Sequence, residues 1–196
     1  MRVIAGELGG RELVTSAGGR TRPTTARVRR SLFDMLTPVL PGASCLDLFA
    51  GSGALGIEAI SRGAEHCWFV EADRAALRAL RTNLNNLGLR ERSRVIPGDV
   101  LRIISRLREQ HGAPFDLVLA DPPYERGLAR QTLELAGEQR LVRPGGLLVI
   151  QHAPQEELLP GAANLVLSRR VDFGETCLSL YRAEAGPERG GEDRLG

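Results

Sequence analysis

The stretch Cys45-Leu46-Asp47-Leu48-Phe49-Ala50-Gly51-Ser52-Gly53-Ala54-Leu55-Gly56 decides the fold of this chain. Its first five residues, 45–49, are mostly apolar and predict a buried strand. The glycines that follow let the backbone turn tightly and come close to a ligand. A helix is expected from this loop to about Arg62, and its amino end presents unpaired N–H groups. The stretch therefore predicts a strand, a ligand-binding loop and a helix.

Strands and helices alternate after this stretch. We expect strands at 66–71, 94–97, 115–120 and 147–151, and helices capped by Asp73 through Asn86, at 100–110 and at 128–138. Such alternation predicts an α/β fold with a doubly wound, mostly parallel sheet. Two last β runs, 163–172 and 176–182, indicate an antiparallel addition at one edge. Residues 143–146, Arg-Pro-Gly-Gly, are expected to form a turn before strand 147–151.

The amino-terminal residues form a separate pattern. Two short β-prone runs, 2–4 and 11–14, lie around Gly6 and Gly9-Gly10 and predict a hairpin. A polar loop, 16–22, comes next. Pro23 and Thr24-Thr25 then predict the start of a helix.

Arginine is the basic residue throughout, since the 26 basic residues include no lysine, and the net charge is only +2. The first thirty residues carry seven arginines against two glutamates. The planar guanidinium matches phosphate, and basic clusters give non-specific affinity for nucleic acid. We expect Arg22, Arg27, Arg29 and Arg30 to contact nucleic-acid phosphates. A merely solvated helix face is the alternative reading of the last three.

Other site types find little support in the composition. The sequence has no apolar run long enough to span a membrane and no signal-peptide pattern, which predicts a soluble, cytoplasmic protein. Three cysteines (45, 67 and 177) and three histidines (66, 111 and 152) lack the spacing of metal ligands. We therefore expect no metal, and we expect the cysteines to be small buried residues.

The tetrapeptide Asp121-Pro122-Pro123-Tyr124 is the candidate catalytic motif. It follows the apolar run 115–120, so it lies at a strand's carboxyl end, where open α/β sheets bind ligands. Two prolines hold the chain extended and supply carbonyls without N–H groups. The Asp121 carboxylate and these carbonyls suit a planar amine or amide with two N–H donors, and the Tyr124 ring can stack on it. A strand-end turn with a capping carboxylate is the structural alternative.

The glycine loop admits two cofactors. Gly51 to Gly56 satisfies G-x-G-x-x-G, and Glu71 lies twenty residues beyond Gly51, which also fits NAD. S-adenosylmethionine is favoured by Asp47, whose carboxylate would repel a pyrophosphate but accept from an ammonium group. Asp99, at a third strand end, adds an acceptor for an adenine amine. No hydride-transfer pair lies near the tetrapeptide.

These motifs together resemble one family. Residues 47–53, Glu71 and 121–124 are similar to the motifs of S-adenosylmethionine-dependent amino-methyltransferases. Residues 2–6 and 22–25 with Leu32-Phe33 narrow the resemblance to the RsmD family, bacterial methyltransferases of the guanine N2 amine in small-subunit 16S ribosomal RNA. The resemblance covers about 2–182, nearly the whole chain.

The resemblance implies a Rossmann-like class I methyltransferase fold with an amino-terminal β-hairpin. It further implies cofactor contacts by Asp47, Gly51, Gly53, Glu71 and Asp99, with Glu71 on the ribose hydroxyls, and catalytic roles for Asp121, Pro122 and Tyr124. The implied partner is small-subunit ribosomal RNA or the assembled 30S subunit, and we expect a monomer. We divide the chain into an RNA-binding hairpin and loop (1–24), a methyltransferase domain (25–183) and a disordered tail (184–196).

Other functions fit parts of the same pattern. A DNA adenine-N6 or protein glutamine-N5 methyltransferase could use the same tetrapeptide, because each target is a planar amine or amide. An NAD-linked oxidoreductase fits the glycine loop alone. A non-catalytic RNA-binding module fits the arginines, although the presence of both Asp47 and Asp121 argues against it.

Overall fold

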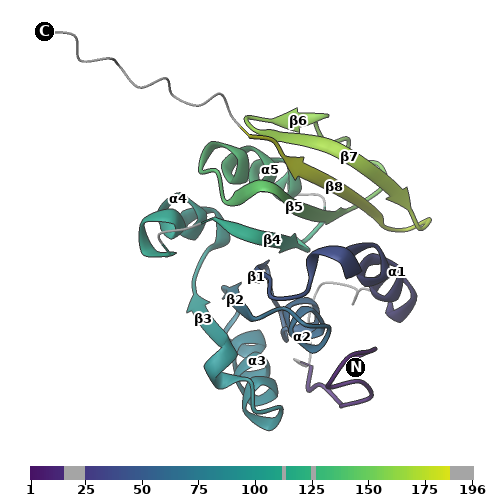
Figure 1. The fold of residues 1–196 in the computed structure, drawn as a ribbon, viewed down its shortest axis with the longest axis vertical. Coiled ribbons are helices and arrows are strands. Elements are labelled where there is room, and N and C mark those ends of the chain that lie inside the picture. The colour runs from purple at the N-terminus through teal and green to yellow at the C-terminus, as the bar shows by residue number, and fades with distance from the viewer. Residues whose placement is uncertain (16–24, 112–113, 125–126, 186–196) are drawn as a thin grey trace, which may run out of the picture.

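An eight-stranded sheet forms the centre of the molecule in the computed structural model, which describes residues 1–15, 25–111, 114–124 and 127–185 (Figure 1). The strand order is β3-β2-β1-β4-β5-β8-β7-β6. Five strands pair in parallel: β1 (Ser44–Leu48), β2 (His66–Glu71), β3 (Ser93–Pro97), β4 (Phe115–Ala120) and β5 (Val142–His152). Three antiparallel strands complete one edge: β8 (Cys177–Ala183), β7 (Leu165–Asp172) and β6 (Gly161–Ala162). The predicted fold class is confirmed.

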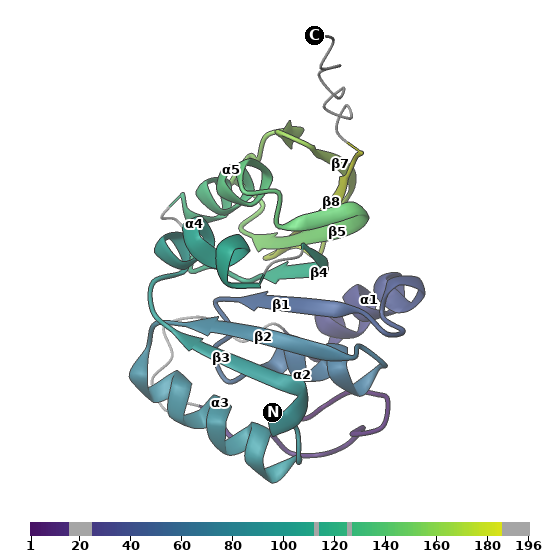
Figure 2. The same ribbon diagram turned by 60° about the vertical axis from the view of Figure 1, so that its left-hand side comes forward.

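Helices cover both faces of this sheet (Figure 2). They are α1 (Ala26–Leu36), α2 (Ala54–Ser61), α3 (Arg74–Asn86), α4 (Val100–His111) and α5 (Leu128–Glu138), with short 3₁₀ turns at Thr37–Val39 and Arg90–Arg92. At the amino ends of α3 and α1, a side chain satisfies a backbone N–H group that the helix itself leaves unpaired. The Asp73 carboxylate accepts from Ala76 N at 2.8 Å, as predicted, and Thr25 Oγ1 accepts from Val28 N at 3.3 Å.

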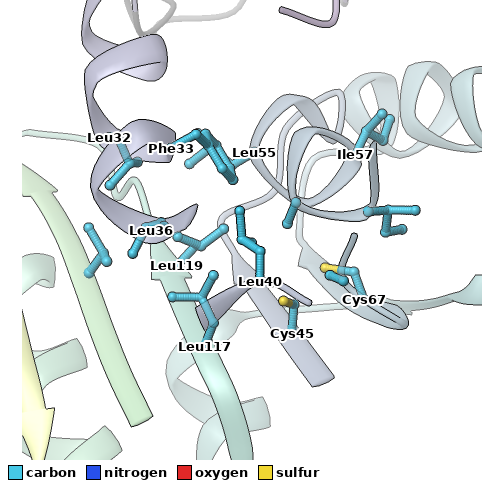
Figure 3. Close-up of a cluster of buried hydrophobic side chains, with 14 of the residues drawn as sticks. Leu32, Phe33, Leu36, Leu40, Cys45, Leu55, Ile57, Cys67, Leu117 and Leu119 are labelled. Carbon is cyan, nitrogen blue, oxygen red and sulfur yellow. The ribbon is translucent and has the colours of Figure 1, made fainter. Parts of the chain in front are cut away.

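Alternation along the strands divides the apolar core between the two faces. Leu117 and Leu119 of β4 face α1 and α2, where they lie in one cluster with Phe33 and Leu36 (Figure 3). The neighbouring Val118 faces the opposite side, in a second cluster with residues of α4 and α5. All three cysteines are buried and unpaired with one another, as the sequence predicted.

The amino-terminal segment is a reduced form of the expected hairpin. Its two arms meet at an isolated antiparallel bridge between Arg2 and Glu12, supported by Val3 N to Arg11 O at 3.0 Å. Gly6 turns the chain with φ +84°, and a Cβ there would lie 1.8 Å from Ser61 O. Glycine is therefore required at position 6, where the segment packs directly against the end of α2.

Strand β5 differs from the prediction. The sequence places a turn at 143–146, whereas β5 begins at Val142 and runs through these residues. The register with β4 shifts there, since Phe115 pairs with Val142 and Leu117 with Leu147. Proline and glycine are typical of such irregular pairs, so the turn signal marks a bulge within a strand.

Two of the predicted segments lie wholly or mostly outside the residues that the structure describes. The loop 16–22 and most of the tail 184–196 lie outside the described residues. In the described part of the tail, Glu184 N donates to Asn164 O at 2.8 Å. None of the helices within the described ranges combines the length and the apolar character needed to cross a membrane.

Candidate active site

The predicted site residues converge because neighbouring parallel strands end together. Strand β1 pairs with β2 on one side and β4 on the other, with Leu48 opposite both Val70 and Ala120. The chain leaves these strands at the glycine loop, at Glu71 and at Asp121. Asp121 N reaches Leu48 O at 3.4 Å, so the tetrapeptide begins beside the glycine loop.

The glycine loop holds an unusual backbone path. Phe49, a non-glycine residue, has φ +61°, and Gly51 and Gly53 follow at +57° and +87°. A Cβ at Gly53 would lie 2.5 Å from Leu80 Cδ1, whereas a Cβ at Gly51 would meet none of the described residues within 4 Å. Glycine is therefore favoured at position 53 by its positive φ and by the close approach of the Leu80 side chain on α3. Gly51 instead borders open space, as expected where a ligand approaches the backbone.

Asp47 is a buried carboxylate at the end of β1, only 1% exposed. Its Oδ2 accepts from Gly56 N at 2.8 Å, which ties it to the first turn of α2. Its Oδ1 has no hydrogen-bond partner among the described residues. Burial raises the pKa of Asp47 to about 8; the Gly56 N–H opposes this rise, and nearby Asp121 and Glu71 add to it. Such a buried acceptor is suited to a cationic ligand group.

Replacing Asp47 with asparagine is expected to stabilise the protein increasingly as pH rises. Between the ordinary pKa of 3.8 and about 8, folded Asp47 keeps a proton that the unfolded chain releases, so the free energy of unfolding falls as pH rises. The asparagine side chain does not titrate. The difference in unfolding free energy between Asp47→Asn and the wild type should therefore grow from pH 5.5 to 8 and level off above. Urea unfolding at several pH values measures it, and a constant difference would contradict the prediction.

Glu71 and Asp99 hold backbone N–H groups at the next two strand ends. Glu71 Oε2 accepts from Gly51 N at 2.7 Å, and its Oε1 accepts from Ala72 N and Asp73 N. The carboxylate thus ties the glycine loop to the turn after β2. Asp99 is exposed and accepts from Arg102 N at 3.0 Å, in the first turn of α4.

The tetrapeptide places a half-buried carboxylate and an aromatic ring at the end of β4. Asp121 and Tyr124 are both partly exposed, and Pro122 between them is buried. The Tyr124 hydroxyl lies 2.7 Å from Thr176 Oγ1 and 3.2 Å from Gln151 Nε2, which donates to it. Two protein groups thus engage the hydroxyl, so the ring is held by its far end. Its faces, rather than its hydroxyl, are suited to contact a ligand.

Sequence reasoning missed the residues that support the site. Gln151 and Thr176 come from β5 and from the turn before β8, far from Tyr124 in the chain. Asn83 on α3 donates to Ser52 O and Val14 O, both at 2.9 Å, and so joins the glycine loop to the amino-terminal segment. One signal existed for Gln151, a polar residue that ends an apolar strand. Nothing local marked Thr176 or Asn83.

The four predicted arginines have different surroundings. Arg22 lies outside the described residues, and Arg27 and Arg30 are exposed on α1. Arg29 is 2% exposed; its Nη2 donates to Arg2 O at 2.5 Å, and its Nε lies 4.0 Å from Glu58 Oε2. Burial lowers the pKa of Arg29, and Glu58 opposes that effect. Arg29 thus joins α1 to the amino-terminal segment, away from the surface that Arg27 and Arg30 share.

The acidic side chains of the site do not form a metal centre. Within the described ranges, no three or more histidine, cysteine, aspartate or glutamate side chains are grouped so that they could hold a metal ion.

Known proteins are similar to this chain in sequence and in fold. The family model described as "Conserved hypothetical protein 95" matches residues 1–182. "Putative rRNA methyltransferase YlbH" of Bacillus subtilis is 38% identical, with 93% of this chain and 98% of the relative covered. "Ribosomal RNA small subunit methyltransferase D" of Escherichia coli is 37% identical, with coverage of 94% and 91%. The solved structure titled "Putative methyltransferase yhhF from Escherichia coli" has a TM-score of 0.84 at 37% identity, covering 95% of this chain and 99% of that one.

Proposed function

Because this chain belongs to the family described as "Conserved hypothetical protein 95", which is the RsmD family that its sequence motifs indicate, we propose that it methylates small-subunit ribosomal RNA. The methyl donor is S-adenosylmethionine, and the acceptor is the exocyclic N2 amine of one guanine. The observation that carries the proposal is that two corners, the places where the chain leaves the paired strands β1 and β4, are neighbours. Asp47 is one of the last two residues of β1, the glycine loop follows β1, and the tetrapeptide follows β4.

The residues at the first corner fit S-adenosylmethionine. The buried Asp47 Oδ1, which has no partner in the part of the chain that the structure describes, suits the ammonium group of the methionine end, directly or through water. The open space beside Gly51 lets a ligand approach the backbone. Glu71 would hold the ribose hydroxyls and Asp99 the adenine amine. When bound, the cofactor supplies a methyl group already activated by a positively charged sulfur.

The second corner is suited to the amine. Asp121 and the neighbouring carbonyls accept its two hydrogens, which frees the nitrogen lone pair from delocalisation into the base. Tyr124 stacks on the base, a contact worth about 1 to 3 kcal/mol in other nucleic-acid complexes. Catalysis then depends on positioning and electrostatics, with no covalent enzyme intermediate. Asp121 need not be a strong base, because the amine proton becomes acidic only after transfer and water can remove it.

The acceptor amine must be accessible. Side chains reach an exocyclic amine poorly within a stacked helix, so the target is a loop nucleotide or a flipped base. We take the substrate to be ribosomal RNA, either free or within the assembled 30S subunit, and the enzyme to act as a monomer. The exposed Arg27 and Arg30 would contact its phosphates.

One experiment tests the reaction and its acceptor. Unmodified small subunits, free 16S ribosomal RNA, DNA and cell protein are each incubated with the enzyme and methyl-labelled S-adenosylmethionine, then digested to nucleosides or amino acids. N2-methylguanosine from the RNA is the expected product. Label in N6-methyladenine of DNA or N5-methylglutamine of protein would overturn the proposal in favour of those reactions. Comparing free RNA with subunits identifies the form that is methylated.

A further inference from the structure

A groove runs between helix α1 and strand β7 on one face of the molecule. It is lined by Arg27, Arg30, Ser31, Asp34 and Met35 of α1 and by Arg169 of β7. We call it the α1–β7 groove. The two walls are more than 130 residues apart in the chain, so the pattern of the sequence alone does not join Arg169 to the α1 arginines.

A bulge in β7 turns Arg169 toward α1. The register with β8 shifts between Leu167, which is opposite Tyr181, and Arg169, which is opposite Leu180. Tyr181 packs in the core cluster of α4 and α5, whereas Leu180 packs in the cluster of α1. Regular pairing would place Ser168 opposite Leu180 and would turn Arg169 to the other face, because side chains alternate along a strand. The extra residue thus brings a third arginine to the groove.

The groove is basic. Arg27, Arg30 and Arg169 are all exposed, so their guanidinium groups are accessible to a ligand. Asp34 is the single acid among the six lining residues, and it already pairs with Arg62 at 3.0 Å. Three guanidinium groups therefore face one carboxylate whose charge another arginine offsets. Arginine forks match phosphate oxygens well.

The hairpin of β7 and β8 connects the groove to the substrate corner. From Arg169, strand β7 continues to its last residue, Asp172, over about 10 Å at the usual rise per residue. Asp172 pairs with Cys177 at the start of β8. Thr176, the residue before Cys177, has its Oγ1 2.7 Å from the Tyr124 hydroxyl. A nucleic-acid strand bound along the groove therefore leads toward the ring on which a base would stack.

We propose that the α1–β7 groove binds the sugar–phosphate backbone of the RNA that flanks the target guanine, with Arg169, Arg27 and Arg30 on its phosphates. The inference rests on the proposed function, since it assigns a further part of the same substrate. Arg169 is the new residue in this assignment.

The test compares Arg169→Gln with a matched exposed arginine, Arg106→Gln, on α4 across the sheet. RNA affinity is measured over a series of salt concentrations, with methyl transfer to the same RNA and to small subunits. For Arg169→Gln we expect the slope of log affinity against log salt to become shallower by about 0.7 for each single-strand phosphate that is no longer neutralised. We also expect its KM for RNA to rise more than its kcat falls. Arg106→Gln should match the wild type.

The outcomes separate the two proposals. Equal salt slopes and KM values for the two variants, with an active wild type, would overturn the groove assignment and leave the methyl-transfer function intact. A changed KM on subunits, together with unchanged affinity for free RNA, would also overturn it, in favour of an acidic protein segment in the groove. A wild type that transfers no methyl group to ribosomal RNA would instead overturn the proposed function. The salt slopes for RNA would still test the groove.

Discussion

Replacing Asp121 with alanine is expected to reduce methyl transfer by roughly 100- to 1000-fold, the loss seen when one preorganised polar group is removed from an active site. Affinity for S-adenosylmethionine should change by less than about twofold. The carboxylate accepts from the substrate amine, so its loss leaves that amine without its main orienting partner. The cofactor residues lie on the neighbouring strand ends and keep their own backbone contacts.

The charges of Asp47 and Asp121 support this separation of cofactor binding from substrate binding. Burial is the main cause of the raised pKa of Asp47, and Asp121 raises it further. Removing Asp121 therefore makes Asp47 easier to ionise, which does not weaken a site for an ammonium group. Equal losses of transfer and cofactor affinity would contradict the assignment of Asp121 to the substrate.

Single-turnover transfer and calorimetric titration of the cofactor measure the two effects. Asp116→Ala is the matched control, because Asp116 lies at the other end of β4 and accepts from Ser44 N at 2.7 Å. That variant should lose stability without a selective loss of transfer. Asp121→Asn keeps an acceptor oxygen but not the charge, and should retain more activity than Asp121→Ala.

The sequence alone was sufficient to predict those helices and strands whose ends are marked by their own residues. The helix 128–138 was predicted with its observed bounds, and Asp73 was identified as a cap. The strand ends were also predictable, because the apolar runs stop at the glycine loop, at Glu71 and at Asp121. Parallel pairing then brings those ends together, so the candidate site follows from the order of the strands.

Long-range contacts explain what the sequence could not indicate. The Arg-Pro-Gly-Gly segment has the local features of a turn, but pairing with β4 draws it into β5 as an irregularity. Arg29 was grouped with Arg27 and Arg30, although it lies three, four and seven residues before the buried Leu32, Phe33 and Leu36 and so belongs to the apolar face of α1. It is buried because Glu58 on α2 and the carbonyl of Arg2 lie where its side chain points.

Replacing Glu58 with alanine should destabilise the protein by about 3 to 5 kcal/mol, as expected when one partner of a buried ion pair is removed. Glu58 is fully buried and accepts from Ile4 N at 2.7 Å, Ala5 N at 3.1 Å and Arg62 Nε at 2.8 Å. Without it, two backbone N–H groups lose their acceptor, and the buried Arg29 loses its nearest carboxylate. The amino-terminal segment should then separate from α2.

Asp34 offers a control that shares a partner with Glu58. It pairs with the same Arg62 at 3.0 Å, but its side chain is 64% exposed. Solvent weakens exposed pairs, so Asp34→Ala should cost less than about 1 kcal/mol. Urea unfolding gives both free energies, and hydrogen exchange at Ile4 and Ala5 reports detachment of the segment. Similar losses for the two variants would show that burial does not set the strength of this contact, and unchanged exchange in Glu58→Ala would show that other contacts hold the segment.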